Sequence, residues 1–315
     1  MQQTDTSVIL SARHARLERV AIDHTGLPGL HAWRVNNRVG EAPNWCSASQ
    51  TLLWIDVRAP AVQQLDPRTD KVTIWQLPEV VGAMGLAAAG SVVLALRRSL
   101  ALLNLESGRL QTLLTVDDEP LHNRLNDGKV SPSGRWFVFG SMDERPDNKQ
   151  ASGALYCAGR EGPARRLHGG LTVANGIAFS PNGQTLYFSD SHAGRVWHAA
   201  WDEAKGVMGA AVLLCSSDES AGRPDGAAVD SNGHYWSAGV SAGCLNRISP
   251  NGELLERVPL PCRAPTMPCF GGEAMTDLYV TSLVRPAWAV GPSDLDGAIL
   301  SWRSTALGQA VPRWR

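Results

Sequence analysis

The chain has 315 residues, of which 43% are hydrophobic and 19% charged, and its formal net charge is −1. These values are typical of a soluble globular protein with a large core, and near-neutral charge without a basic run argues against a surface for nucleic acids or anionic membranes. No apolar stretch is long enough to span a membrane, and the N-terminus lacks the apolar segment of a secretory signal. The six cysteines show no C-x-x-C pair and no zinc spacing, so we expect reduced thiols and a cytoplasmic location.

Residues 1–30 precede the patterned part of the chain, and we expect them to form an N-terminal extension. Within it, only residues 10–20 compete as an amphipathic helix, so the extension is expected to add either a short helix or a closing strand to the domain that follows. From residue 31 onward, short apolar runs alternate with turns rich in Pro, Asn, Gly and Asp, a pattern typical of β-strands joined by tight turns.

One sequence phrase occurs three times: RLNDGKVSPSGRWFVFG from residue 124, VANGIAFSPNGQTLYFSD from residue 173 and RPDGAAVDSNGHYWSAG from residue 223. Each copy places Asn or Asp eight residues before a turn glycine, with apolar segments on both sides of the turn. Three further segments follow the same spacing: GEAPNWCSASQTLLWID from residue 40, GAMGLAAAGSVVLALR from residue 82 and MPCFGGEAMTDLYVTS from residue 267. We call the position eight residues before the turn position of each unit its slot, and the six slots are Glu41, Gly82, Asn126, Asn175, Asp225 and Met267.

The slots follow one another at intervals of 41 to 50 residues. A repeat of this length, with two or more short strands in each unit, is typical of a β-propeller. The sequence therefore predicts an all-β fold, a six-bladed β-propeller with a central channel, as a single domain over residues 31–315. The alternative is a β-sandwich whose turns share this spacing by coincidence, and one spacing common to six units argues against it.

A propeller places equivalent positions of its blades at the same height around the axis, so the slots should converge on one mouth of the channel. Four of the six carry oxygen-bearing side chains. Two carboxylates and two carboxamides facing one another would be costly without a partner, and a divalent cation would relieve that cost. Oxygen ligands suit Ca²⁺, Mg²⁺ or Mn²⁺ better than structural zinc. The alternative is that Asn and Asp before Gly simply form turns, but Glu41 precedes Ala-Pro and has no such role.

Five motifs in the same order resemble those of the SMP-30/gluconolactonase/regucalcin-like (LRE) family of six-bladed propeller lactonases: GEAPNW, RLNDGKVSPSGRW, ANGIAFSPNGQTLY, RPDGAAVDSNGHYW and CFGGEAMTDLYVTS. The resemblance covers roughly residues 36–305. It implies metal-dependent hydrolysis of a sugar lactone, an aldonolactone, to the corresponding aldonic acid. It also implies one divalent metal ion, whose identity among Ca²⁺, Zn²⁺, Mn²⁺ and Mg²⁺ the sequence leaves open.

The resemblance also implies roles for individual residues. The metal ligands are expected to be Glu41, Asn175 and Asp225. The residues expected to bind the substrate are Arg124, Asn126 and Glu144. The chain departs from the family pattern at three places, none of which removes an expected ligand: Ala42 where Gly is common, Ser131 where Asp is frequent, and Met267 where Asn is often found.

Asp225 is our candidate for the general base that takes a proton from the attacking water. A carboxylate bound to a cation is a poor base because the positive charge lowers its pKa. The role of Asp225 as a base is therefore a separate prediction from its role as a metal ligand. Arg124 either donates hydrogen bonds to the substrate or forms a salt bridge between blades. Glu144 begins the polar segment ERPDNKQASG, which is either a partial lid or a solvated turn. No G-x-S-x-G motif is present, which disfavours a covalent acyl-enzyme.

Two other functions remain open at this point. The same site could serve a broader ester or organophosphate hydrolase, because propellers host several chemistries. Alternatively, the protein could be a calcium-binding propeller that acts as a scaffold without catalysis.

Overall fold

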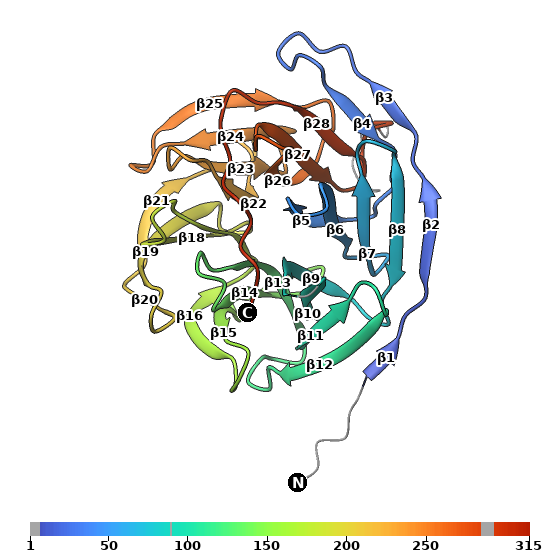
Figure 1. Cartoon of the computed structure of the whole chain (residues 1–315). Coiled ribbons are helices and arrows are strands. Elements are labelled where there is room, and N and C mark those ends of the chain that lie inside the picture. Colours follow the sequence, from blue (N-terminus) through green and yellow to red (C-terminus); the bar gives the residue numbers. More distant parts are fainter. Residues whose placement is uncertain (1–6, 89, 285–292) are drawn as a thin grey trace.

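Six antiparallel β-sheets surround a central channel, as Figure 1 shows in a view along its axis. This computed structural model describes residues 7–88, 90–284 and 293–315. The described part of the chain contains no helix, and therefore none that could span a membrane. The predicted all-β, six-bladed propeller is confirmed.

The first three blades occupy the half of the sequence that ends near residue 171. Blade 1 contains β5 (Gly40–Cys46), β6 (Thr51–Asp56), β7 (Ala61–Asp66) and β8 (Lys71–Gln76). Blade 2 contains β9 (Val81–Leu86), β10 (Ser91–Leu96), β11 (Ser99–Asn104) and β12 (Arg109–Thr115). Blade 3 contains β13 (Asn123–Val130), β14 (Phe137–Asp143), β15 (Gly153–Ala158) and β16 (Arg165–Leu171).

The last three blades complete the ring. Blade 4 contains β17 (Ala174–Phe179), β18 (Thr185–Asp190), β19 (Arg195–Asp202), β20 (Val207–Met208) and β21 (Val212–Ser216). Blade 5 contains β22 (Pro224–Val229), β23 (Tyr235–Gly239), β24 (Cys244–Ile248) and β25 (Leu254–Pro259). Blade 6 begins with β26 (Pro265–Gly271), β27 (Asp277–Ser282) and β28 (Ile299–Arg303).

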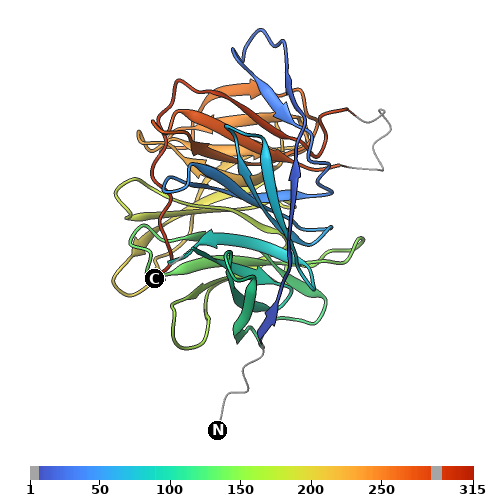
Figure 2. The ribbon, with the colours of Figure 1, turned by 45° about the vertical axis from the view of Figure 1, so that its right-hand side comes forward.

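Strands from the first 33 residues of the chain complete three of these sheets. β1 (Ser7–Ile9) pairs with β12, and β2 (Ala12–Arg16) pairs with β8. β4 (His31–Trp33) pairs with β28, and β3 (Arg19–Ala21) pairs with β4. Blade 6 is thus built from both ends of the chain, which closes the ring. Figures 1 and 2 show these blue strands running along the outside of the propeller.

All six slots lie on the innermost strand of a blade, as the repeat predicted. The turn that follows is tight, and three of the turn glycines adopt φ values that other residues rarely adopt: 79° at Gly134, 68° at Gly183 and 85° at Gly233. The first two strands of blade 2 are buried throughout, and those of the other blades are buried at nearly every position, because both of their faces pack against neighbouring blades. The regular meander therefore follows from local turn chemistry and from apolar runs of strand length.

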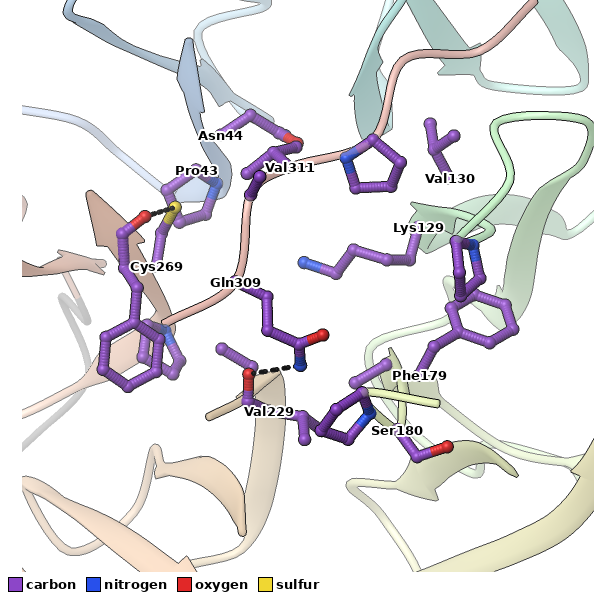
Figure 3. A pocket seen from close by; sticks show the side chains of 18 residues that line it. Pro43, Asn44, Lys129, Val130, Phe179, Ser180, Val229, Cys269, Gln309 and Val311 are labelled. Carbon is purple, nitrogen blue, oxygen red and sulfur yellow. Dashed lines mark hydrogen bonds between the residues drawn. The ribbon is translucent and has the colours of Figure 1, made fainter. Parts of the chain in front are cut away.

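The C-terminal segment closes one end of the channel. After β28 the chain crosses to blades 2 and 3, where Trp314 N donates a 2.8 Å hydrogen bond to Leu86 O and Arg315 N donates to Gly134 O at 2.8 Å. A pocket of about 260 Å³ remains at this end; Lys129 points into it, and Gln309 and Val311 of the crossing segment line it (Figure 3). The crossing segment therefore restricts access to the inner strands from this side.

Candidate functional site

A cavity of about 270 Å³ lies where the innermost strands begin, at the mouth opposite the C-terminal segment. Four slot side chains line it, and they come from four different blades: Glu41, Asn126, Asn175 and Asp225. Other described lining residues with polar side chains are Arg124, Lys149, Ser191, His192 and Arg223. The structure therefore brings together the three expected metal ligands and two of the three expected substrate-binding residues.

The other two slots, Gly82 and Met267, are not among the described residues that line this cavity. Gly82 packs against the backbone of Leu125, where a Cβ would collide with the carbonyl oxygen. The close approach of β9 and β13 explains glycine at this slot. Met267 is fully buried and packs against Gly226. The Met267 side chain fills the space between β22 and β26. The slot of blade 6 therefore contributes no polar side chain to the cavity.

All four lining slots lie at a break in strand pairing. The register of the inner strand shifts after Glu41, after Asn126 and after Asn175, and across Asp225 it shifts between Pro224 and Ala227. After the first three slots, the next residue adopts a left-handed backbone conformation, with φ of 48° at Ala42, 39° at Asp127 and 62° at Gly176. Such bulges redirect side chains, and here they occur where the strands meet the cavity. Ala42, where the family commonly has glycine, thus adopts a conformation that glycine tolerates better.

A chain of hydrogen bonds links the slots of blades 3, 4 and 5. Arg124 Nη1 donates to Asn126 Oδ1 at 2.7 Å, and Asn126 Nδ2 donates to Asn175 Oδ1 at 3.1 Å. Asn175 Nδ2 then donates to Asp225 Oδ1 at 2.5 Å and to Ser191 Oγ at 2.8 Å. The side chains form a continuous polar arc around the cavity, so each one fixes the orientation of the next.

The carboxylates of the cavity lie close enough to repel one another. The pKa of Glu41 is raised well above its usual range, first by its removal from bulk water and then by the negative charges of Asp225 and Asp127. A hydrogen bond from Ala42 N, 3.0 Å from Glu41 Oε2, and the charge of Arg124 oppose this shift. Without a further positive charge, the ionised pair is therefore unfavourable.

The side chain of Asp127 connects the inner strands that carry Asn126 and Asn175. Its buried carboxylate accepts hydrogen bonds from Gly128 N at 2.6 Å and, across the blade boundary, from Ile177 N at 2.8 Å. Burial raises the pKa of Asp127, while Lys129 and the backbone donors lower it. The carboxylate holds the bulge of β13 against that of β17, so it positions Asn126 and Asn175 without lining the cavity.

Glu144 contacts three arginines rather than the cavity itself. Its carboxylate lies 3.5 Å from Arg124 Nε and 3.7 Å from Arg58 Nη1, and it accepts a 2.5 Å hydrogen bond from Arg97 Nη1. Arg124 is buried, and burial lowers its pKa to about 10. Its Nε is buried and lies against the Glu144 carboxylate without a hydrogen bond. Glu144 orients Arg124, and its predicted contact with the substrate stays a prediction.

The side chains at the floor of the cavity fit a divalent cation. The described residues contain no cluster of three His, Cys, Asp or Glu, and this site offers instead two carboxylates and a carboxamide. Oxygen donors of this kind are those that hard divalent cations prefer. The repulsion between Glu41 and Asp225 is the unfavourable charge that such a cation would neutralise. Glu41, Asn175 and Asp225 are the residues that would hold it.

Comparison with known proteins shows the family to which the chain belongs. Residues 39–284 match the family model described as the SMP-30/Gluconolactonase/LRE-like region. The chain belongs to this family. A 6-deoxy-6-sulfogluconolactonase from Pseudomonas putida is 37% identical over 277 residues, which is 87% of this chain and 94% of the relative. A regucalcin from Xenopus laevis is 32% identical over 249 residues, covering 78% of this chain and 83% of the relative.

A solved structure named as a regucalcin shares the fold of this chain. The crystal structure of a calcium-binding regucalcin from Agrobacterium tumefaciens aligns with a TM-score of 0.83 at 26% identity, over 90% of this chain and 95% of that one.

Sequence reasoning did not identify Arg58, Arg97 or Lys149 near the site. These three residues lie outside the repeated phrase, so no spacing in the sequence indicates where they meet.

Proposed function

We propose that this member of the SMP-30/gluconolactonase family hydrolyses a sugar lactone to the corresponding aldonic acid with the help of one divalent cation. The observation that carries the proposal is the gathering of Glu41, Asn175 and Asp225 from three blades at the floor of one cavity. The Pseudomonas putida relative, which the chain matches over 87% of its length, is named as a lactonase, and the Agrobacterium structure is named as a calcium-binding protein.

The reaction needs a polarised carbonyl, an activated water and a place for developing negative charge. When bound, a divalent cation would supply Lewis acidity and lower the pKa of a water molecule. The oxygen of water joins the carbonyl carbon, and the bond from that carbon to the ring oxygen breaks. In this proposal Asp225 takes the proton from the attacking water and returns it to the ring oxygen, which leaves as a hydroxyl group.

The remaining polar residues bind and orient the lactone. Arg124 Nη1 is held by Asn126 Oδ1 and by Leu125 O at 2.9 Å, so the guanidinium is fixed before substrate arrives. We assign the contact with a ring hydroxyl to the guanidinium of Arg124, which lines the cavity. Asn126 and Ser191, which also line the cavity, offer further polar contacts.

The test is hydrolysis of a panel of gluconolactone, xylonolactone, arabinonolactone and galactonolactone after chelation and re-addition of Ca²⁺, Mg²⁺, Mn²⁺ or Zn²⁺. We expect activity to disappear on chelation and to return with at least one cation. Failure of every lactone with every cation would refute the proposal. An aryl ester turned over as fast as the best lactone would point to the broader ester hydrolase, and cation binding without any turnover would point to the scaffold.

A further inference from the structure

The mouth of the cavity carries more positive charge than its own carboxylates balance. Three guanidinium groups share the single carboxylate of Glu144, and they come from three neighbouring blades: Arg58 follows β6, Arg97 lies between β10 and β11, and Arg124 is on β13. The side chains of Arg58 and Arg97 are 53% and 41% exposed. Their outer donors therefore remain accessible from solvent at the rim.

Lys149 adds a fourth positive charge, and it lines the cavity directly. Its ammonium donates a 2.6 Å hydrogen bond to the main-chain oxygen of Asp143. The Asp143 carboxylate is occupied by Arg145, whose Nη2 lies 2.5 Å from it, and by Gln150 N at 2.7 Å. No described carboxylate forms an ion pair with Lys149. Burial lowers the pKa of Lys149; the negative charge of Asp143 opposes this shift, and the charges of Arg124 and Arg58 add to it.

The two ends of the cavity thus differ in charge. The carboxylates of Glu41 and Asp225 lie at the floor, where the proposed cation would neutralise them. The rim has Arg58, Arg97, Arg124 and Lys149 around Glu144 alone. An excess of positive charge beside a desolvated cavity attracts an anion, because field lines concentrate in a cleft with low-dielectric walls.

We propose that the lactone bound by this protein carries an anionic group, a sulfonate or phosphate, on its exocyclic carbon, and that Lys149, Arg97 and Arg58 bind that group. This inference rests on the proposed lactonase function and specifies its substrate class. Arginine suits such groups because its planar fork of donors matches two of their oxygen atoms, while lysine contributes a compact charge. Arg124 remains the residue that contacts the sugar ring.

The experiment compares kcat/KM for 6-phosphogluconolactone and for the 6-sulfonate analogue with kcat/KM for uncharged gluconolactone. We expect at least a tenfold preference for an anionic lactone at low ionic strength, and a decline of that preference as salt screens the rim. The variants Lys149→Gln and Arg97→Gln should each lower the preference at least fivefold. Phosphate and sulfonate in parallel show which anion the rim prefers.

Arg303→Gln is the matched control, because Arg303 is 74% exposed on β28 and pairs only loosely with Asp277 at 3.8 Å. It should leave the preference unchanged. Lys149→Glu provides a second test at the same position and should reverse the preference toward uncharged lactone. Calorimetric binding of 6-phosphogluconate against gluconate gives a readout that does not need turnover, and the same variants should weaken only the former.

The outcomes separate the two proposals. Absence of hydrolysis with all lactones refutes the proposed function. Hydrolysis of charged and uncharged lactones with equal kcat/KM, or a preference that survives both Lys149→Glu and Arg97→Gln, overturns the anionic substrate while the lactonase function stands.

Discussion

Asn175 donates a 2.5 Å hydrogen bond from its side-chain amide to the carboxylate of Asp225, although the two residues lie on the inner strands of different blades. The bond fixes the carboxamide with its nitrogen toward Asp225 and its oxygen toward Asn126. The positions of these two side chains are therefore coupled, and a substitution at either residue should shift the side chain of the other.

Asp225→Asn tests the role of the carboxylate with almost no change in shape. We expect kcat/KM for the best lactone to fall about 10²–10⁴-fold, the range typical of a lost general base. The far-ultraviolet circular dichroism should be unchanged. Activity within threefold of the original protein would contradict the assignment of Asp225 as base.

Glu41→Gln tests the charge balance at the cavity floor. In the original protein, a cation at 100 times its dissociation constant should raise the free energy of unfolding by about 2.7 kcal/mol, because it binds only the folded state. The variant lacks one of the two repelling carboxylates, so chelation should lower its Tm less than it lowers the Tm of the original protein. Thermal unfolding with and without chelator measures both effects. Equal responses in the two proteins would argue against Glu41 as a ligand.

Much of this arrangement could be predicted from the sequence because it depends on local spacing. The eight-residue interval between slot and turn is set within one hairpin, so it repeats in every blade and identifies Glu41, Asn175 and Asp225 as equivalent positions. Ala42 shows where that reasoning ends: its φ of 48° comes from a bulge, which neither its residue type nor its neighbours indicate.

The residues of the rim could not be predicted for a different reason. Arg58, Arg97 and Lys149 lie in connections whose lengths differ between blades, so the repeat gives them no common position. Only the closure of the ring places these connections side by side. The closing strand β4 is equally hard to predict, because it is three residues long and its partner β28 lies more than 260 residues away.

Asp127→Asn tests the connection that the Asp127 carboxylate makes between β13 and β17. The amide can replace only one of the two accepting oxygens, so either Gly128 N or Ile177 N loses its hydrogen bond. A buried donor left without a partner costs about 1–3 kcal/mol, which should appear as a lower midpoint in urea unfolding. We also expect lower kcat with little change in KM, because the slots shift. Loss of stability with unaltered kcat would show that Asp127 acts on the fold alone.

The carboxyl group of Asp143 should make the free energy of unfolding depend on pH in the acidic range. Hydrogen bonds from Arg145 hold the pKa of this carboxyl well below its usual range, so the folded state binds its proton less readily than the unfolded chain. The resulting stabilisation is present above about pH 4, the ordinary pKa of Asp, and is lost as the pH falls further toward the folded-state pKa. Asp143→Asn should therefore lower the free energy of unfolding by about 1–3 kcal/mol at pH 7. The difference between the two proteins should shrink below pH 4, and a constant difference would contradict this origin.

Trp33→Ala should show how much of the fold depends on the closing strand. Trp33 is fully buried on β4, stacks on Tyr279 with ring centroids 6.2 Å apart, and donates a 2.9 Å hydrogen bond from Nε1 to Asp70 Oδ1. Removing a large buried aromatic side chain costs about 3–5 kcal/mol, and here it also weakens the pairing that joins the two ends of the chain. Val8→Ala is the control, because Val8 is 49% exposed on the edge strand β1 and should change stability by less than about 0.5 kcal/mol. If both variants unfolded at the same denaturant concentration, closure by β4 would not limit the stability of the propeller.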